Sequence, residues 1–146
     1  MYLDTSILIK LLVRETDSAY FNEQLAGQAL SSSELMWTEV RSALQQKERA
    51  QQITPADGNR AWRVFREWVQ SEQIVLHPLN GVVLKKANHI LERCHPAVPL
   101  RTLDAIHTAA CDLSQDFPLC TTDRRMRDAA SVLAIPVFPA NGSPNP

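Results

Sequence analysis

The chain has 146 residues, of which 45% are hydrophobic and 21% charged, and its formal net charge is −1 at pH 7. This length and composition fit one globular domain with a substantial core, and the charge excludes the strongly basic surface that would indicate nucleic-acid binding by composition alone. The three cysteines include no C-x-x-C pair, which argues against a disulfide framework or a zinc ribbon and suits a reducing compartment.

Short strand-like and longer helical segments alternate along the chain, which predicts an α/β fold with a parallel sheet. The N-terminal elements are a strand over residues 1–3, helices over 6–13 and 17–27, and a strand over 28–33. The apolar run in the first helix is too short to span a bilayer and lacks a signal-peptide cleavage site. We therefore expect a cytoplasmic protein without a membrane segment.

Two helix starts follow the second strand. Ser31 and Glu34 have the spacing of a capping box and predict a helix over residues 34–50, which contains Glu39. Thr54 is the expected N-cap of the next helix, because proline and an acidic residue follow it in the first turn. Its apolar face carries Ala61, Phe65, Trp68 and Val69.

The remaining chain predicts three more strands and three more helices. In order they are a strand over residues 74–79, a helix over 81–94, a loop over 95–102, a helix over 103–114, a strand over 118–122, a helix over 124–134 and a strand over 135–138. A single domain then spans residues 1–138. The tail, residues 139–146, has no apolar face to bury, and we expect it to be mobile.

Four acidic residues stand at the ends or starts of these elements. Asp4 follows the first strand, Asp123 follows the strand over 118–122, Asp104 opens a helix and Glu39 lies within one. In a parallel sheet, ligands bind beyond the carboxyl ends of the strands, so Asp4 and Asp123 share an edge if their strands are neighbours. The other two carboxylates can reach that edge from the flanking helices.

A cluster of carboxylates needs a proton or a cation. Two carboxylates about 4 Å apart repel each other by roughly 4 kcal/mol at an effective dielectric constant near 20. Magnesium or manganese suits such a cluster, because both are hard ions that take oxygen ligands. The acids therefore predict a site for Mg²⁺ or Mn²⁺.

The stretches "LDTSIL", "TEVRSAL", "LDAIHTAA" and "TTDRRMRDAA" resemble the motifs of PIN-domain ribonucleases, above all the VapC toxins of toxin–antitoxin modules. They cover the whole chain in the family's order, and the four acids fall at the family's acidic positions. The resemblance implies a PIN-like three-layer sandwich with a central parallel sheet of about five strands. It also implies a metal-dependent endoribonuclease toxin that cleaves tRNA or rRNA, forms a homodimer and is neutralised by a VapB-like antitoxin.

Hydrolysis of a phosphodiester requires an activated water and positive charge against the developing charge on phosphorus. We expect Asp4 and Asp104 to bind the metal directly, and Glu39 and Asp123 to complete its coordination through water or to orient the attacking water. Hydroxyl groups nearby are suited to hold these carboxylates by outer hydrogen bonds. The candidate hydroxyl residues are Thr5, Ser6 and Thr121.

Each acid also has a structural interpretation. Asp4 alone fits a turn and Asp104 alone a helix N-cap, because Asp is favoured at such positions. Glu39 fits a solvated helix residue, and Asp123 fits a cap of the following helix. A zinc site is a further alternative, because His107 and Cys111 share a helix stripe with Asp104, although both also fit core positions on an apolar helix.

Basic and aromatic residues outside the acidic set leave two interpretations open. They either track an RNA backbone and stack on bases, or form a solvated face and part of the core. These residues are Arg60, Arg63, Arg66, Lys85, Lys86, Arg101, Trp62 and Trp68. Near the acids, Ile7, Leu11 and Trp62 are expected to hold an amphipathic partner helix.

Two other enzyme classes fit less well. A haloacid-dehalogenase-type phosphatase needs a second Asp two residues after the first, where this chain has Ser6. A response-regulator receiver needs an acidic pair at that same strand end, and this chain has none there. The remaining alternative is a non-catalytic RNA-binding or protein-interaction domain that retains the PIN fold. Only an activity measurement with and without metal separates that domain from a nuclease.

Overall fold

The computed structural model of the chain describes residues 1–141, and its elements follow the predicted order. The strands are β1 (Tyr2–Leu3), β2 (Leu30–Ser33), β3 (Ile74–His77), β4 (Leu119–Cys120) and β5 (Val137–Phe138). The helices are α1 (Thr5–Leu12), α2 (Ser18–Leu25), α3 (Met36–Arg49), α4 (Pro55–Gln70), α5 (Gly81–Cys94), α6 (Thr102–Ser114) and α7 (Arg124–Leu133).

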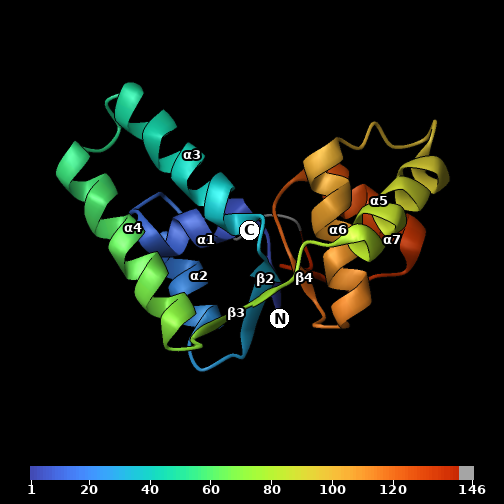
Figure 1. The fold of residues 1–146 in the computed structure, drawn as a ribbon, viewed down its shortest axis with the longest axis horizontal. Coiled ribbons are helices and arrows are strands. Elements are labelled where there is room, and N and C mark those ends of the chain that lie inside the picture. The colour runs from blue at the N-terminus through green and yellow to red at the C-terminus, as the bar shows by residue number, and fades with distance from the viewer. Residues whose placement is uncertain (142–146) are drawn as a thin grey trace.

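The five strands form one parallel sheet in the order β3-β2-β1-β4-β5. Figure 1 shows α1 to α4 on one side of this sheet and α5 to α7 on the other. The predicted three-layer α/β sandwich is therefore confirmed. From β1, the chain builds outward to β2 and β3 and later returns to the opposite side of β1 with β4, so the topological switch point lies between β1 and β4.

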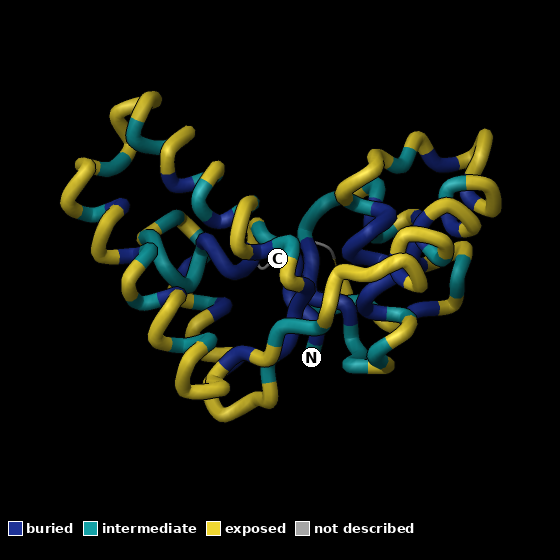
Figure 2. The backbone as a smooth tube through the Cα atoms, viewed as in Figure 1, coloured by how far each residue is buried: buried dark blue, intermediate teal, exposed yellow. Residues whose placement is uncertain are grey.

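The core consists of two apolar clusters, one on each face of the sheet. Tyr2 belongs to the cluster under α5, α6 and α7, and the next residue, Leu3, belongs to the cluster under α1 to α4. Leu119 and Cys120 of β4 divide between the clusters in the same way, because successive side chains of a strand point to opposite faces. Figure 2 shows the central strands β1, β2 and β4 and the inward sides of the helices as buried, whereas the edge strands β3 and β5 are partly exposed.

The predicted start of α4 is confirmed. The Thr54 side chain accepts a hydrogen bond from the Asp57 N–H at 3.2 Å, and the Asp57 carboxylate accepts one from the Thr54 N–H at 3.2 Å. Pro55 occupies the first helical position, where its missing N–H costs no hydrogen bond. This reciprocal cap fixes where the α3–α4 hairpin turns.

The capping box predicted for Ser31 and Glu34 is wrong. Ser31 lies within β2 and is buried, so its side chain cannot reach the start of α3. The Ser33 hydroxyl instead accepts a hydrogen bond from the Leu35 N–H at 3.2 Å, and the Glu34 carboxylate accepts one from the Leu79 N–H at 3.0 Å. Pairing of β2 with both neighbouring strands has overridden the local capping signal.

Two sequence predictions concern the ends of the chain and membranes. Of the tail predicted to be mobile, residues 142–146 lie outside the described residues. Among residues 1–141, none of the helices combines the length and the apolar character that crossing a lipid bilayer requires.

Ion pairs tie α3 and the start of α2 to α1. Lys10 contacts Glu15 at 3.0 Å and Asp17 at 2.8 Å, and Lys47 of α3 contacts Glu15 at 2.6 Å. Burial by itself raises the pKa of Glu15, but hydrogen bonds from Lys47 and Lys10 outweigh burial and lower that pKa. Glu15 therefore contributes to stability while it is ionised.

We predict that Glu15→Gln lowers the free energy of unfolding at pH 7 by about 1 kcal/mol or less, because the pairs are partly exposed to solvent. Since the pKa of Glu15 is lowered by folding, its contribution is present above about pH 4.5, its ordinary value, and disappears as the pH falls further. Urea unfolding between pH 3 and 7 measures the difference. Glu23→Gln, which changes an exposed helix acid, is the control; an equal effect of both substitutions would contradict the prediction.

Candidate active site

Asp4 and Asp123 lie at the carboxyl edge of the sheet, beyond the neighbouring strands β1 and β4. Tyr2 pairs with Leu119 and Leu3 with Cys120, so both strands end at the same level. The Asp4 N–H continues the ladder by donating to the Cys120 carbonyl at 3.1 Å. This position is the topological switch point, where sheets of this kind bind their ligands.

Asp4 is a buried carboxylate surrounded by hydrogen-bond donors. It is the N-cap of α1 and only 4% exposed. Its Oδ1 accepts hydrogen bonds from the Ile7 N–H at 2.9 Å and the Ser6 hydroxyl at 2.8 Å, and its Oδ2 accepts one from the Thr121 hydroxyl. Burial raises the pKa of Asp4, although hydrogen bonds from Thr121, Ile7 and Ser6 oppose the rise. A cation beside Asp4 would favour its ionised form.

Thr121 connects Asp4 to Asp123. Its hydroxyl donates to Asp4 and accepts a hydrogen bond from the Asp123 N–H at 3.0 Å. Asp123 caps α7, as one interpretation of the sequence held, because its Oδ1 accepts from the N–H groups of Arg125 at 2.8 Å and Met126 at 3.1 Å. The helix cap uses Oδ1 of Asp123, so Oδ2 is available for a different contact, with the Arg125 side chain.

Glu39 reaches this region from the first turn of α3. Its Oε2 accepts hydrogen bonds from the Thr5 hydroxyl and from Nε2 of His107, the latter at 2.6 Å. Burial by itself raises the pKa of Glu39, but the hydrogen bonds from His107 and Thr5 outweigh it and lower the pKa. The side chain is 18% exposed, so the interpretation of Glu39 as a solvated surface residue is wrong.

His107, for which the sequence analysis left a zinc site and a core position open, contacts the acid Glu39. It is 3% exposed and lies between Glu39 and Tyr2, whose hydroxyl is 2.9 Å from Nδ1. Burial raises the pKa of the Tyr2 hydroxyl far above its ordinary value, so the phenol stays protonated while it hydrogen-bonds Nδ1. Because the ionised Glu39 carboxylate can only accept, Nε2 of His107 carries a proton and donates a hydrogen bond to Glu39. The available signal was the i+3 spacing between Asp104 and His107 on α6.

Asp104 lies in the first turn of α6 and is joined to Asp123 by Arg125. Nε of Arg125 is 3.3 Å from Asp104 Oδ2, and Nη2 is 3.1 Å from Asp123 Oδ2. Asp104 is not the N-cap of α6 that one interpretation of the sequence held it to be: Arg101 is the N-cap, and its N–H donates to Asp104 Oδ2 at 3.3 Å. Arg125 is a second residue that the sequence analysis did not assign to the site.

The structure does not support the zinc alternative. His107 uses both ring nitrogens for Tyr2 and Glu39, and Cys111 is fully buried. Burial raises the pKa of the Cys111 thiol to about 12, which disfavours the thiolate that a zinc site requires. Cys111 therefore belongs to the core, and His107 holds Glu39 rather than a zinc ion.

The donor set fits a hard divalent cation. Asp4, Asp104 and Asp123 supply carboxylate oxygens, and two of them already face a cationic group, the guanidinium of Arg125. Within residues 1–141, however, no three His, Cys, Asp or Glu side chains are placed close enough together to hold a metal ion. In this arrangement, the Arg125 guanidinium lies between the carboxylates of Asp104 and Asp123.

The apolar residues expected to hold a partner helix are dispersed. Ile7 is fully buried and cannot contact a partner. Leu11 lines an open hollow of about 500 Å³ with Leu25 and Trp68. Trp62 lies elsewhere, in an aromatic cluster on α3 and α4.

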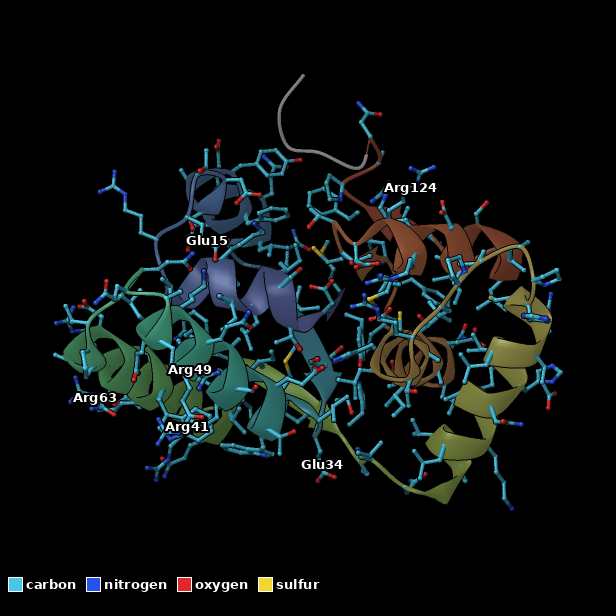
Figure 3. All side chains as sticks on the ribbon, turned by 90° about the horizontal axis from the view of Figure 1, so that it is seen from above. Glu15, Glu34, Arg41, Arg49, Arg63 and Arg124 are labelled. Atoms are coloured by element: carbon cyan, nitrogen blue, oxygen red, sulfur yellow. The ribbon has the colours of Figure 1, made fainter. Side chains whose placement is uncertain are left out.

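That aromatic cluster comprises Trp37, Trp62 and Phe65, with ring centroids 5.1 to 5.9 Å apart. The guanidinium carbon of Arg41 lies 4.8 Å from the centre of the Trp62 ring. Figure 3 shows Arg41, Arg49 and Arg63 along the same α3–α4 hairpin. The α3–α4 hairpin, whose first turn carries Glu39, therefore also presents basic and aromatic side chains.

Known proteins resemble the chain over nearly its whole length. Residues 1–132 match the PIN domain. The chain is 33% identical over 150 residues to ribonuclease VapC45 of Mycobacterium tuberculosis (strain CDC 1551 / Oshkosh) and to ribonuclease VapC49 of strain ATCC 25618 / H37Rv, with 99% of this chain and 98% of each relative covered. It is 34% identical over 146 residues to ribonuclease VapC46 of strain ATCC 25618 / H37Rv, covering 94% of this chain and 95% of the relative.

We predict that Tyr2→Phe lowers the free energy of unfolding by about 1–3 kcal/mol, because it leaves Nδ1 of the buried His107 without its partner. The measurement is urea unfolding followed by circular dichroism. Tyr20→Phe is the matched control, because Tyr20 is partly exposed and contributes its ring to stacking on Phe138. A Tyr2→Phe protein as stable as the parent would show that the Tyr2–His107 contact does not hold His107 in place.

Proposed function

Because the chain belongs to the PIN-domain family and is homologous to the VapC ribonucleases, we propose that it is a metal-dependent endoribonuclease that acts as the toxin of a toxin–antitoxin module. Its substrate is tRNA or rRNA, its metal is Mg²⁺ or Mn²⁺, and it works in the cytoplasm as a homodimer. A VapB-like antitoxin neutralises it.

The observation that carries this proposal is the linkage of all four acids at one sheet edge. Thr121 joins Asp4 to Asp123, and Arg125 joins Asp123 to Asp104. Glu39 is tied to the residue after Asp4 through the Thr5 hydroxyl. These contacts link, through Thr121 and Arg125, carboxylates that are up to 119 positions apart in the sequence, from Asp4 to Asp123.

In this proposal, Asp4 and Asp104 hold the metal directly, and Glu39 and Asp123 act through water. A bound Mg²⁺ or Mn²⁺ would supply an activated water and positive charge for the phosphate. The chain's own groups prepare that position: the Thr121 and Ser6 hydroxyls fix Asp4, and His107 and Thr5 fix Glu39. Such outer hydrogen bonds hold carboxylates in the orientation that binding and water activation require.

We predict that Asp4→Asn, Glu39→Gln, Asp104→Asn and Asp123→Asn each reduce RNA cleavage by about a hundredfold or more, because each removes a ligand or a group that orients water. Cleavage of total tRNA and rRNA in Mg²⁺, with parallel reactions in EDTA, measures the loss. Asp128→Asn is the matched control, because Asp128 is an exposed acid on α7 that pairs only loosely with Arg124, at 3.8 Å.

Two outcomes would contradict the proposed function. Parental cleavage rates in all four variants would exclude the acids from catalysis, and undiminished cleavage in excess EDTA would exclude the metal. RNA binding without cleavage by the parent protein in either ion would instead favour the alternative, a non-catalytic RNA-binding domain with the PIN fold. Circular dichroism of each variant tests whether the fold is retained.

Inhibition by the antitoxin is proposed to use the same acids. A basic side chain of the antitoxin can enter the acidic edge, where Asp104 and Asp123 already accept a guanidinium. Its apolar residues can occupy the hollow lined by Leu11, Leu25 and Trp68, which lies at the amino ends of β2 and β3, so the partner must reach both edges of the sheet. Inhibition and binding then depend on different parts of the partner.

We predict that replacing the inserted arginine of the antitoxin by alanine restores most RNA cleavage while it weakens binding only modestly, because the apolar contacts remain. Titration calorimetry measures binding, and RNA cleavage is assayed at matched occupancy. Complete inhibition by the alanine variant at equal occupancy would show that steric cover, rather than occupation of the acidic edge, stops cleavage.

A further inference from the structure

Arg125 forms the only bridge between two of the acids that comes from a basic side chain within residues 1–141. Its Nε is 3.3 Å from Asp104 Oδ2 and its Nη2 is 3.1 Å from Asp123 Oδ2. The same Nη2 donates a hydrogen bond to Asp123. One guanidinium thus offsets the charge of two carboxylates that come from different helix starts, α6 and α7.

The position of Arg125 on its helix does not explain this contact. Arg125 is the second residue of α7, and a cation there is disfavoured by the positive end of the helix dipole. Its Nε is buried and lacks a hydrogen bond of acceptable geometry, even though Asp104 Oδ2 lies 3.3 Å away. The distance permits an attraction between charges, whereas the angle does not permit a good hydrogen bond. Arg125 is therefore held mainly by the two carboxylates, and its contact with Asp104 lacks the geometry of a good hydrogen bond.

Arg124 provides an internal comparison. It precedes Arg125 in the same helix turn, but its side chain is 93% exposed, and it pairs with Asp128 at 3.8 Å. Figure 3 labels Arg124 at the start of α7, where it extends away from the ribbon. The two arginines carry the same charge, and only Arg125 contacts the acids.

We propose that Arg125 is the internal counter-ion of Asp104 and Asp123, and that a divalent cation must displace it to bind these carboxylates. This inference rests on the proposed function, because it concerns the metal of the same site. In the metal-free protein, Arg125 reduces the repulsion between the two acids and holds them together. When a cation binds, it competes with the guanidinium for the same carboxylate oxygens, so Arg125 sets how much free metal the protein needs.

The test compares the metal affinity of two variants that lose the same charge. Mn²⁺ binding by the full chain is measured by titration calorimetry and by the loss of the electron paramagnetic resonance signal of free Mn²⁺. We expect Arg125→Met to bind Mn²⁺ at least about tenfold more tightly than the parent, which corresponds to about 1.4 kcal/mol. Arg124→Met changes the net charge equally and should alter the affinity by less than about twofold, since its charge is exposed and screened.

Thermal unfolding gives a second measure of the counter-ion role of Arg125. Without metal, Arg125→Met should unfold at a lower temperature than Arg124→Met, because Asp104 and Asp123 then repel each other without a counter-ion. The rise in unfolding temperature on adding Mn²⁺ should be larger for Arg125→Met than for the parent. Arg125→Lys keeps the charge but not the planar fork that reaches both carboxylates, so its Mn²⁺ affinity should fall between those of the parent and Arg125→Met.

The outcomes separate this inference from the proposed function. If the parent binds Mn²⁺ and cleaves RNA, but Arg125→Met binds Mn²⁺ no more tightly than Arg124→Met, the counter-ion role is refuted and the nuclease stands. If Arg125→Met binds Mn²⁺ more tightly but no RNA is cleaved, the nuclease is refuted and the counter-ion role stands. If no variant binds Mn²⁺, both are refuted.

Discussion

The hydrogen bond from the Thr121 hydroxyl to Asp4 is the contact on which the site depends. It joins the ends of β1 and β4 at the switch point of the sheet, and the Asp123 N–H donates to the same hydroxyl. Thr121 therefore acts as donor to one acid and as acceptor from the backbone of another. Because β1 and β4 contain two residues each, the strands alone offer few ladder bonds to fix these ends, and the side-chain contact fixes where the two carboxylates lie.

The four acids fall into three groups according to the neighbours that stabilise them. Asp4 is buried among donors that carry no charge, Glu39 contacts His107, and Asp104 and Asp123 share Arg125. Desolvation raises the pKa of Asp4, whereas hydrogen bonds lower the pKa of Glu39. An incoming cation would therefore favour the ionised form of the buried Asp4, whereas Asp104 and Asp123 already contact a guanidinium.

The sequence predicted the fold and the acidic edge because both depend on local patterns and on one topological rule. Alternating elements indicated a parallel sheet, and Asp4 and Asp123 each directly follow a strand. The partners of the acids were not predictable in this way: Tyr2 and His107 are 105 positions apart, and their contact exists only after α6 packs on β1. The role of Arg125 was not predictable because residues beside a helix cap usually face solvent, as Arg124 does. The capping box predicted at Ser31 was wrong because strand pairing buries that serine.

The hydrogen bonds already made by the acids restrict how a cation can be bound. A carboxylate has about four lone-pair positions, and Asp4 uses two on Oδ1 and one on Oδ2. Only Oδ2 retains capacity, so Asp4 can bind a cation through one oxygen. Asp123 uses Oδ1 for the cap of α7, and Glu39 uses Oε2 for Thr5 and His107. Within residues 1–141, Asp4 Oδ2 keeps spare capacity and Asp104 Oδ1 and Glu39 Oε1 accept no hydrogen bond, whereas Asp123 Oδ2 already accepts one from Arg125. Single-oxygen contacts of this kind suit Mg²⁺, which takes a few carboxylate oxygens and keeps several waters.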